Sequence, residues 1–501
     1  MMTREDILNK ADDIVSELHG FVELKAKSAE RADLVERGLL DKLLTLGAAL
    51  MQAYFEFAGD GDVGPTWEQD GEVRRRLDDF RRRSYHSIFG VCEVERCVYS
   101  VGERQKTHAP LDAKLGLPEG EHSYVLEDFL ERFCVKNAFG DSVQSLKDLF
   151  GRCVSKRTAE RLNQEFGQQI AAIREQTEAQ PLEEPEAEIL VASVDGKGVP
   201  MCGTVEQKRG LPETPNQKHR RKKRQQKAEH QSKHRLPPGH GKTHKQMAWI
   251  SAVYSIDTFQ RTADEVLDEL NGQRTKQHPR PVNKRLRAQL TDYVEGQRVN
   301  GQDKIFDDVA SQIRDRDPAS QKQVVCLMDG QRSLWDRQAN FLPGAIRILD
   351  IFHVSEKLWD AAYCFHSKCS QAADAFVEHY LRLLLEGKVE TVLRSLRAKL
   401  RGLKSTKRKK LKAVIRYYDN NQQTMQYDEY LASGYPIGSG VIEGGCRHLV
   451  KDRMERTGMR WQIDGAQAML NTRTAYLNEE WDDMIETRIQ REQVRLYALS
   501  T

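Results

Sequence analysis

The stretch "EILVASVDGKGVPM", residues 188–201, decides the fold class of this chain. Isoleucine, leucine and valine dominate its first half, and Asp195 follows them directly. Three later stretches have the same apolar character: residues 245–257, 322–330 and 344–354. Asp329 and Asp350 end the apolar runs of the last two. Short apolar runs separated by helical patterns are typical of a mixed α/β domain. The sequence therefore predicts an α/β domain with four strands and with an aspartate at the end of three of them.

The residues before this domain have different patterns. Apolar residues at three- and four-residue spacing predict helices in residues 1–58. Residues 59–71 are rich in glycine and aspartate and predict a loop, and residues 84–101 alternate around Gly90, as in a β-hairpin. Residues 174–187 are acidic and contain proline, which is typical of a linker.

A possible DNA-binding element lies between the hairpin and the linker. We expect one helix over about 141–149, a short turn, and a second helix capped by Ser155 that runs to about 170. This is the layout of a helix-turn-helix, in which the start of the second helix meets DNA. Lys156, Arg157 and Arg161 lie there. The alternative is two helices of an ordinary bundle.

The charge of the chain is unevenly distributed. The formal net charge is only +3, but residues 205–245 hold thirteen Lys and Arg against three Asp and Glu. Within this stretch we expect Arg220, Arg221, Lys222, Lys223 and Arg224 to contact DNA from a basic loop. A surface segment with only weak, nonspecific affinity is the alternative. The sequence "GHGKT" at 239–243 lacks the first glycine of a phosphate-binding loop, so we expect no nucleotide.

Cysteine and hydropathy patterns bear on the compartment. Nine cysteines without a CxxC pair do not suggest a disulfide framework, and the sequence has no apolar run of roughly 18 residues. The first twenty residues lack the apolar core of a signal peptide. We therefore expect a cytoplasmic protein. The spacing of Cys364, His366 and Cys369 in an expected helix does not favour zinc.

The stretch "YPIGSGVIEGGCRHLVKDRMERTGMRW", residues 435–461, combines a glycine-rich turn with a basic helix. Ser439 is placed to cap the helix, and Glu443 falls in its first turn. Helical spacing puts residues 443, 447, 451 and 454 on one face, so Arg447 and Lys451 follow the carboxylate. A metal ion at Glu443 with phosphates on the two cations is one interpretation. Ordinary surface ion pairs at i,i+4 are the other.

Carboxylates at the ends of neighbouring buried strands repel each other unless a cation neutralises them. Mg²⁺ binds carboxylate oxygens, and two such ions can activate an attacking oxygen and stabilise a leaving oxygen on a phosphodiester. Asp195, Asp329 and Glu443 offer the right ligand type. An aspartate followed by glycine is also common in simple turns, which is the alternative for the first two.

Four stretches together resemble the DDE transposases of bacterial insertion sequences, most closely the ISKra4 family. They are "SVDGKGV", "CLMDGQRSLW", "DIFHVSEKLWDAA" and the stretch at 435–461. The resemblance runs from about residue 84 to the C-terminus. It implies that Asp195, Asp329 and Glu443 form the catalytic triad of an RNase H-like fold, on its first strand, its fourth strand and a helix after an all-α insertion. It also places His353 near the active site, with a core histidine as the alternative, and leaves the role of Asp350 open.

The resemblance implies a function and a domain division. We expect a DNA transposase with two Mg²⁺ or Mn²⁺ ions that binds double-stranded terminal repeats, cleaves them and joins a 3′-hydroxyl to target DNA, as a homodimer or larger assembly. An RNase H-like nuclease without strand transfer and an inactive DNA-binding regulator are the alternatives. Family members often carry a cysteine-rich ribbon after the hairpin, which this sequence lacks, so no zinc is expected there. The expected regions are 1–60 (helical), 61–135 (hairpin and connection), 136–173 (helix-turn-helix), 174–187 (linker) and 188–501 (catalytic, with a basic loop at 205–245 and the insertion at 356–430).

Overall fold

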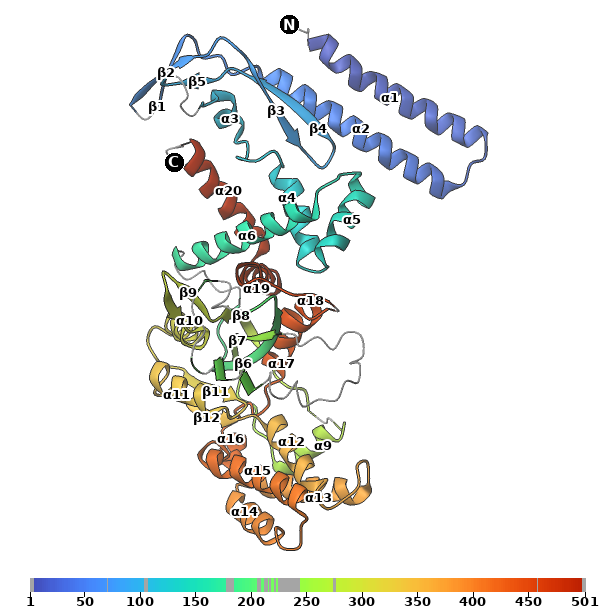
Figure 1. The fold of residues 1–501 in the computed structure, drawn as a ribbon. Helices are drawn as coiled ribbons and strands as arrows, with labels where there is room; N and C mark the ends of the chain where they lie inside the picture. The colour runs from blue at the N-terminus through green and yellow to red at the C-terminus, as the bar shows by residue number, and fades with distance from the viewer. Residues whose placement is uncertain are drawn as a thin grey trace. The chain divides into compact units, whose positions relative to one another are not determined.

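The computed structural model describes most of the chain (Figure 1). The described residues are 4–69, 71–102, 107–176, 184–204, 209–210, 215, 218–219, 222–223, 244–273, 276–456 and 458–497. They form two compact units. The first contains residues 1–174 together with 479–501, and the second contains residues 175–478.

The first unit begins with two long helices, α1 (Arg4–Lys27) and α2 (Ala32–Ala58). Short strands follow: β1 (Thr66–Gln69), β2 (Glu72–Arg76), β3 (Arg81–His86), β4 (Val91–Arg96) and β5 (Tyr99–Ser100). The predicted hairpin is confirmed as the antiparallel pair β3–β4. The predicted loop at 59–71 is wrong in part, because residues 66–69 pair with β2 as an edge strand.

A group of four helices completes the first unit. They are α3 (Pro110–Leu115), α4 (Tyr124–Cys134), α5 (Phe139–Phe150) and α6 (Lys156–Gln176). Leu130 of α4, Leu146 of α5 and Leu162 of α6 share one apolar core. The C-terminal helix α20 (Trp481–Tyr497) also belongs to this unit, where Trp481 packs edge-on against Phe166 of α6. Helix α20 thus belongs to the first unit, whereas the sequence analysis assigned it to the region 188–501.

A five-stranded sheet organises the second unit. Its strands are β6 (Ile189–Met201), β7 (His244–Ile256), β8 (Val282–Leu290), β11 (Gln323–Met328) and β12 (Ile346–Leu349). The order across the sheet is β12-β11-β6-β7-β8. The strands β6, β7 and β8 are antiparallel neighbours, whereas β11 and β12 run parallel to β6. The α/β class is confirmed, with one strand, β8, that the sequence analysis missed.

Helices cover both faces of this sheet. Helix α10 (Gly301–Arg316) packs on the face that carries Arg287, whose guanidinium approaches Asp308. Helix α17 (Gly440–Cys446) packs on the other face, where a Cβ at Gly445 would contact Leu286. Helix α19 (Ile463–Leu477) lies along the edge strand β8, where the Gln467 side chain bonds the backbone of Ala288 and Leu290. A small hairpin, β9 (Asp292–Val294) and β10 (Gln297–Val299), precedes α10. The helices α9 (Ala263–Leu270) and α11 (Arg332–Phe341) connect strands of the sheet.

The segment between β12 and α17 is helical, as the sequence predicts. It consists of α12 (Ile351–Ala362), α13 (Gln371–Leu385), α14 (Val389–Ala398), α15 (Ser405–Asn421) and α16 (Tyr427–Ala432), with a single 3₁₀ turn. Tyr427 and Tyr430 of α16 donate hydroxyl hydrogen bonds to the Leu349 and Arg347 carbonyls of β12. The helical segment therefore covers the free edge of the sheet. The predicted helix through Cys364–Cys369 is wrong, because α12 ends at Ala362 and a turn follows.

Candidate metal centre

The register of the parallel strands places three aspartates next to one another. Cys326 pairs with Ala192, so three residues further along, Asp329 lies level with Asp195. Met328 pairs with Leu349, so one residue further, Asp329 lies level with Asp350. Adjacent strands lie about 4.8 Å apart. The three aspartates are therefore neighbours, and Asp329 interacts electrostatically with both Asp195 and Asp350.

The two predicted strand-end positions are built differently. Asp195 lies inside β6, because this strand continues to Met201 in its pairing with β7. Its expected position at a strand end is therefore wrong, although the parallel pairing with β11 stops before it. Asp329 directly follows β11, and Gly330 then turns the chain with a φ of +85°. A Cβ at Gly330 would crowd Leu349, so both the conformation and the space require glycine.

Asp350 is the fully buried member of the row, and all its polar atoms are used. Its Oδ1 accepts the N–H groups of Ser439 (2.9 Å) and Phe352 (3.3 Å). Its Oδ2 lies 2.6 Å from Nδ1 of His353. Asp350 thus caps α12 and fixes the imidazole, which leaves Nε2 of His353 for another partner. Carboxylates often orient histidines in this way at metal sites.

The turn before α17 places Glu443 next to Asp350 and His353. The Ile351 N–H donates to the Ile437 carbonyl at 2.9 Å, next to the bond between Ser439 and Asp350. Ser439 stands at the N-cap, but its side chain makes no capping bond, contrary to the sequence analysis; its N–H binds Asp350 instead. Ligand atoms of Asp350, His353 and Glu443 all lie within 4.8 Å of one another. Among the described residues, this is the group of acidic, His and Cys side chains that could hold a metal ion.

Cys446 connects α17 to the first aspartate. Its thiol, one helical turn after Glu443, lies 3.4 Å from Oδ2 of Asp195, whose Oδ1 accepts the Gly196 N–H at 2.6 Å. The same thiol interacts electrostatically with Glu443. Burial raises the pKa of the Cys446 thiol, and the charge of Asp195 raises it further, so the group is a neutral donor. The sequence analysis missed Cys446, although its position three residues after Glu443 places both on the same face of a helix.

The pKa shifts agree with this crowding. Burial raises the pKa of Asp329, and the negative charges of Asp195 and Asp350 raise it further. The Gln331 N–H and His353 lower this pKa, but the net shift is upward. The hydrogen bond with Asp350 raises the pKa of His353, as do the charges of Asp350, Asp329 and Asp195. A divalent cation would offset this negative charge, and the donor set of carboxylates with one imidazole suits Mg²⁺ or Mn²⁺. Asp350, His353 and Glu443 thus form one close group. Asp195 and Asp329, two of the three predicted metal ligands, lie outside this group, although Asp329 interacts electrostatically with Asp195, Asp350 and His353.

The predicted basic face after Glu443 is altered by a π-helix. Residues Arg447–Lys451 form a π turn between α17 and the short helix α18 (Asp452–Met454). The wider turn breaks the four-residue spacing. Met454 is therefore fully buried, whereas Glu443, Arg447 and Lys451 are exposed. Glu443 forms no ion pair within the part of the chain that the structure describes, and Arg447 instead approaches Asp452 at 3.7 Å.

The helix-turn-helix residues lie in the first unit. Gly151 ends α5 in the left-handed conformation, and the Ser155 Oγ accepts the Thr158 N–H at 3.0 Å, as the sequence predicts. Lys156, Arg157 and Arg161 are exposed at the start of α6. Arg161 pairs with Glu165 at 2.8 Å and Lys156 approaches Glu160 at 3.9 Å.

Most of the predicted basic loop at 205–245 lies outside the described residues. Lys222 and Lys223 are exposed, while Arg220, Arg221, Arg224 and the "GHGKT" sequence lie outside the described residues.

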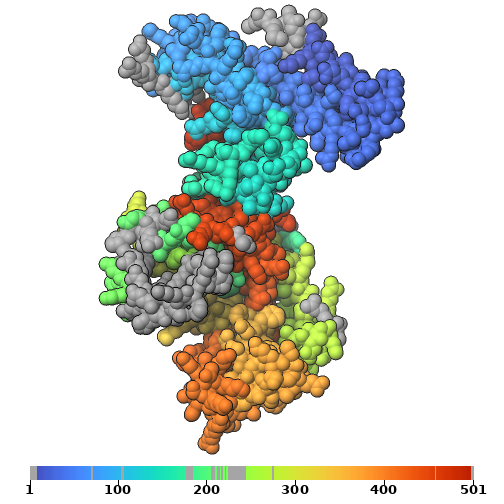
Figure 2. All heavy atoms as spheres, turned by 45° about the vertical axis from the view of Figure 1, so that its right-hand side comes forward, coloured from blue at the N-terminus to red at the C-terminus, as the bar shows by residue number. Residues whose placement is uncertain are grey.

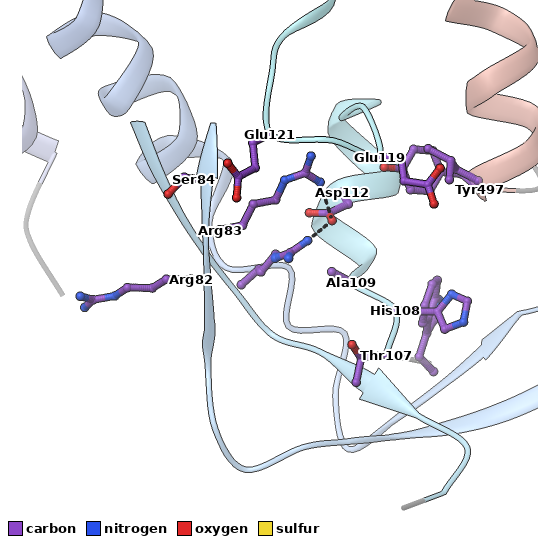
Figure 3. Close-up of a pocket in the computed structure, with 13 residues that line it drawn as sticks. Arg82, Arg83, Ser84, Thr107, His108, Ala109, Asp112, Glu119, Glu121 and Tyr497 are labelled. Atoms are coloured by element: carbon purple, nitrogen blue, oxygen red, sulfur yellow. Dashed lines mark hydrogen bonds and ion pairs between the residues drawn. The ribbon is translucent and has the colours of Figure 1, made fainter. Parts of the chain in front are cut away.

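A cavity of about 470 Å³ lies in the first unit (Figure 3). Arg83 of β3 and Arg96 of β4 both pair with Asp112 of α3, which is buried. Arg83 also donates to the carbonyls of Pro118 and Gly120. The cluster therefore ties α3 and the loop after it to the hairpin, which is a structural task.

No protein-family model matches the chain, and no curated protein matches it. None of the helices in the described ranges combines the length and the apolar character that crossing a membrane requires.

Proposed function

We propose that this chain is a DDE transposase that binds the ends of a DNA element and cleaves and joins DNA strands with two divalent metal ions. The observation that carries the proposal is the neighbouring position of Asp195, Asp329 and Asp350 on three parallel strands, with Glu443 close to Asp350 and His353. Four separate elements, β6, β11, β12 and α17, contribute to it. Such convergence of buried and half-buried acids is costly without a cation.

The order of elements supports an RNase H-like interpretation of the second unit. Asp195 lies on the first strand of the five-stranded sheet, and Asp329 follows the fourth strand in chain order. Glu443 lies on a helix after an all-helical segment. These are the three positions that the resemblance to DDE transposases predicts.

The residues have distinct roles in this proposal. Asp195, Asp329 and Glu443 would hold the ions, which supply an activated oxygen and charge neutralisation at the phosphodiester. Asp350 positions His353, whose Nε2 can bind a phosphate oxygen or carry a proton. Cys446 keeps the Asp195 carboxylate in place. The exposed Arg447 and Lys451 would contact phosphates next to the cut.

The experiment uses linear DNA that carries the sequences flanking the gene, with Mg²⁺ or Mn²⁺ and a plasmid target. We expect cleavage at the element ends followed by joined products. Asp329→Asn should abolish both, whereas Asp336→Asn, an exposed aspartate on α11, should change neither. Cleavage that survives Asp329→Asn would contradict the proposed centre. Cleavage without joined products would favour the nuclease alternative, and end binding without cleavage would favour the inactive regulator.

A further inference from the structure

Helix α15, in the helical segment between β12 and α17, carries a dense set of exposed cations. Residues 399–416 contain nine Lys and Arg and no Asp or Glu. Seven of these cations are exposed and form no ion pair with any described residue: Lys404, Lys407, Arg408, Lys409, Lys410, Lys412 and Arg416. We call these seven residues the α15 cations.

The apolar side of α15 is already used. Its residues Leu411, Val414 and Tyr418 are buried in the core of the second unit, and the helix exposes no large apolar side chain. Helix α15 therefore has no apolar side left for a membrane or for a helix-binding groove of another protein. Helical spacing places Lys409 and Arg416, with Lys412 between them, on the opposite side. Figure 2 shows the helical segment that contains α15, in gold to orange, at the surface.

This arrangement is unfavourable for the protein on its own. Like charges three or four residues apart on a helix repel each other. Cations near the start of a helix also face the positive end of its dipole, and the first turn of α15 has no acidic residue to offset them. A bound polyanion would remove both costs.

Helix α15 is attached directly to the candidate metal centre. The Tyr417 hydroxyl donates a hydrogen bond to the Asp329 carbonyl at 2.9 Å. Lys357, one turn after His353 on α12, lies 5.8 Å from the centre of the Tyr417 ring. Because each helical residue rises about 1.5 Å, Lys409 lies about 12 Å along the axis from Tyr417. A DNA strand has a phosphate roughly every 3.4 Å, so this distance corresponds to about three or four nucleotides.

The residue types indicate how the α15 cations would bind DNA. Five of the seven are lysines, which contact phosphates as point charges. Base recognition uses mainly the planar groups of arginine, asparagine and glutamine. Phosphate contacts carry no sequence information. The set therefore suits a DNA whose sequence is not fixed.

We propose that the α15 cations bind the target DNA through its phosphates, a few nucleotides from the candidate metal centre. This inference rests on the proposed function, because a target exists only for an enzyme that joins strands. It assigns a role to the helical segment, which the predicted recognition of element ends by α6 does not use. Helix α6 belongs to the first unit and α15 to the second.

DNA binding by the full chain in EDTA tests the surface without any reaction. Fluorescence anisotropy compares two duplexes of equal length, one of random sequence and one with the sequence that flanks the gene. The variant Lys409→Gln/Lys412→Gln/Arg416→Gln should lower the affinity for the random duplex at least about tenfold at about 0.1 M salt. Its slope of affinity against salt should fall by about 3, because each phosphate contact contributes roughly 0.9. The affinity for the flanking duplex should change less than about threefold.

The matched control removes three cations that already have partners in the same helical segment. Arg382, Lys388 and Arg397 each pair with a carboxylate, so Arg382→Gln/Lys388→Gln/Arg397→Gln should leave the salt slope unchanged. Glutamine has nearly the helix propensity of lysine and arginine, and circular dichroism melting checks that both variants fold.

Two results would overturn the surface: an unchanged salt slope in the α15 variant, or an equal loss in the control. An equal loss of affinity for both duplexes would overturn the assignment to target DNA. With Mn²⁺ and a plasmid target, the α15 variant should still cut the element ends but give at least about tenfold fewer joined products.

The two proposals can fail separately. Asp329→Asn should abolish cutting and keep the wild-type salt slope in EDTA, because its carboxylate belongs to the metal centre. A wild type that cuts no DNA would contradict the proposed function, and the random-duplex affinity would still decide whether α15 binds DNA.

Discussion

Asp350 is the residue on which the candidate centre depends most directly, although it need not bind a metal itself. It accepts hydrogen bonds from Ser439 before α17 and from Phe352 within α12, and it holds His353. One buried carboxylate thus joins a strand end, a helix start and the turn that carries Glu443. The pattern "DIFH" indicated the histidine but not this joining role, because Ser439 is 89 residues away in sequence.

Replacement of Asp350 by alanine should destabilise the protein. The Ser439 and Phe352 N–H groups would lose their acceptor in a buried place, which should cost about 2–4 kcal/mol. Urea denaturation measures the change. Asp374→Ala, at an exposed first-turn aspartate of α13, is the control and should cost less than about 1 kcal/mol. Equal costs for the two variants would mean that Asp350 has no special structural role.

Asp329→Asn should stabilise the metal-free protein, although it should weaken metal binding. The folded-state pKa of Asp329 is raised, so the stability of the metal-free protein falls as the pH rises through that pKa, and the ionised carboxylate is a net cost at neutral pH. Asparagine removes this cost and can still accept the Gln331 N–H. We expect the melting temperature at pH 7 to rise by about 2–4 °C without metal.

In the presence of Mn²⁺, the wild type should melt at a higher temperature than Asp329→Asn. Metal and proton compete for Asp329, so stabilisation of the wild type by Mn²⁺ should grow as the pH rises through the raised pKa. Asp329→Asn should show little stabilisation, and Asp336→Asn should behave like the wild type. Differential scanning fluorimetry with and without Mn²⁺ measures both effects. The same Mn²⁺ stabilisation in Asp329→Asn would place the metal elsewhere.

At the level of elements, the sequence predicts four of the five strands of the large sheet because their apolar runs are uninterrupted. Strand β8 is the exception, since its buried residues Leu286, Ala288 and Leu290 alternate with arginine and glutamine. This alternation is the pattern of a half-buried strand and could have predicted β8. Similarly, the apolar run before Asp195 suggested a strand end, but β6 continues because β7 pairs with it far beyond the parallel partner.

The candidate site was predictable only as a set of residue types. Asp195, Asp329 and Glu443 could be selected from the sequence, but their proximity depends on strand order and register, which no local pattern contains. The π turn at Arg447–Lys451 shows the same limit. Helical spacing assumes a regular helix, and tertiary packing of Leu449 and Val450 overrides it.

Helix α6 should contribute to DNA binding through charge. Lys156 and Arg157 are exposed at its first turn. Lys156→Ala/Arg157→Ala should lower the slope of affinity against salt by about 2, because each phosphate contact contributes roughly 0.9. Fluorescence anisotropy across a salt series measures it.

The control for α6 is Lys10→Ala/Lys27→Ala, at exposed lysines of α1, which should leave the slope unchanged. An unchanged slope for Lys156→Ala/Arg157→Ala would assign α6 to an ordinary bundle.

At the level of the whole molecule, α20 closes the first unit. Arg488 of α20 pairs with Glu127 of α4, with both side chains buried, and its guanidinium lies over the Phe166 ring at 5.4 Å. Arg174 of α6 binds Glu480 at 2.6 Å, just before α20. The end of the chain therefore stabilises helices that were formed more than 300 residues earlier.

Arg488→Met should destabilise the first unit by about 3–5 kcal/mol, because it leaves Glu127 buried without its partner. The double substitution Arg488→Met/Glu127→Gln should recover most of this loss. Arg495→Met is the control, since its pair with Glu119 is more than half exposed and should contribute less than about 1 kcal/mol. Hydrogen exchange of α4 and α6 reports the effect; no recovery in the double variant would mean that Arg488 acts through packing alone.

The second unit is inserted into the sequence of the first, which has a practical consequence for protein engineering. The chain leaves the first unit after Arg174 and re-enters it at Glu479, so two covalent bridges join the units. After a protease cuts one of these connections, the other still links the second unit covalently to part of the first. The second unit is one continuous segment, so its expression alone requires one fragment, whereas the first unit requires two.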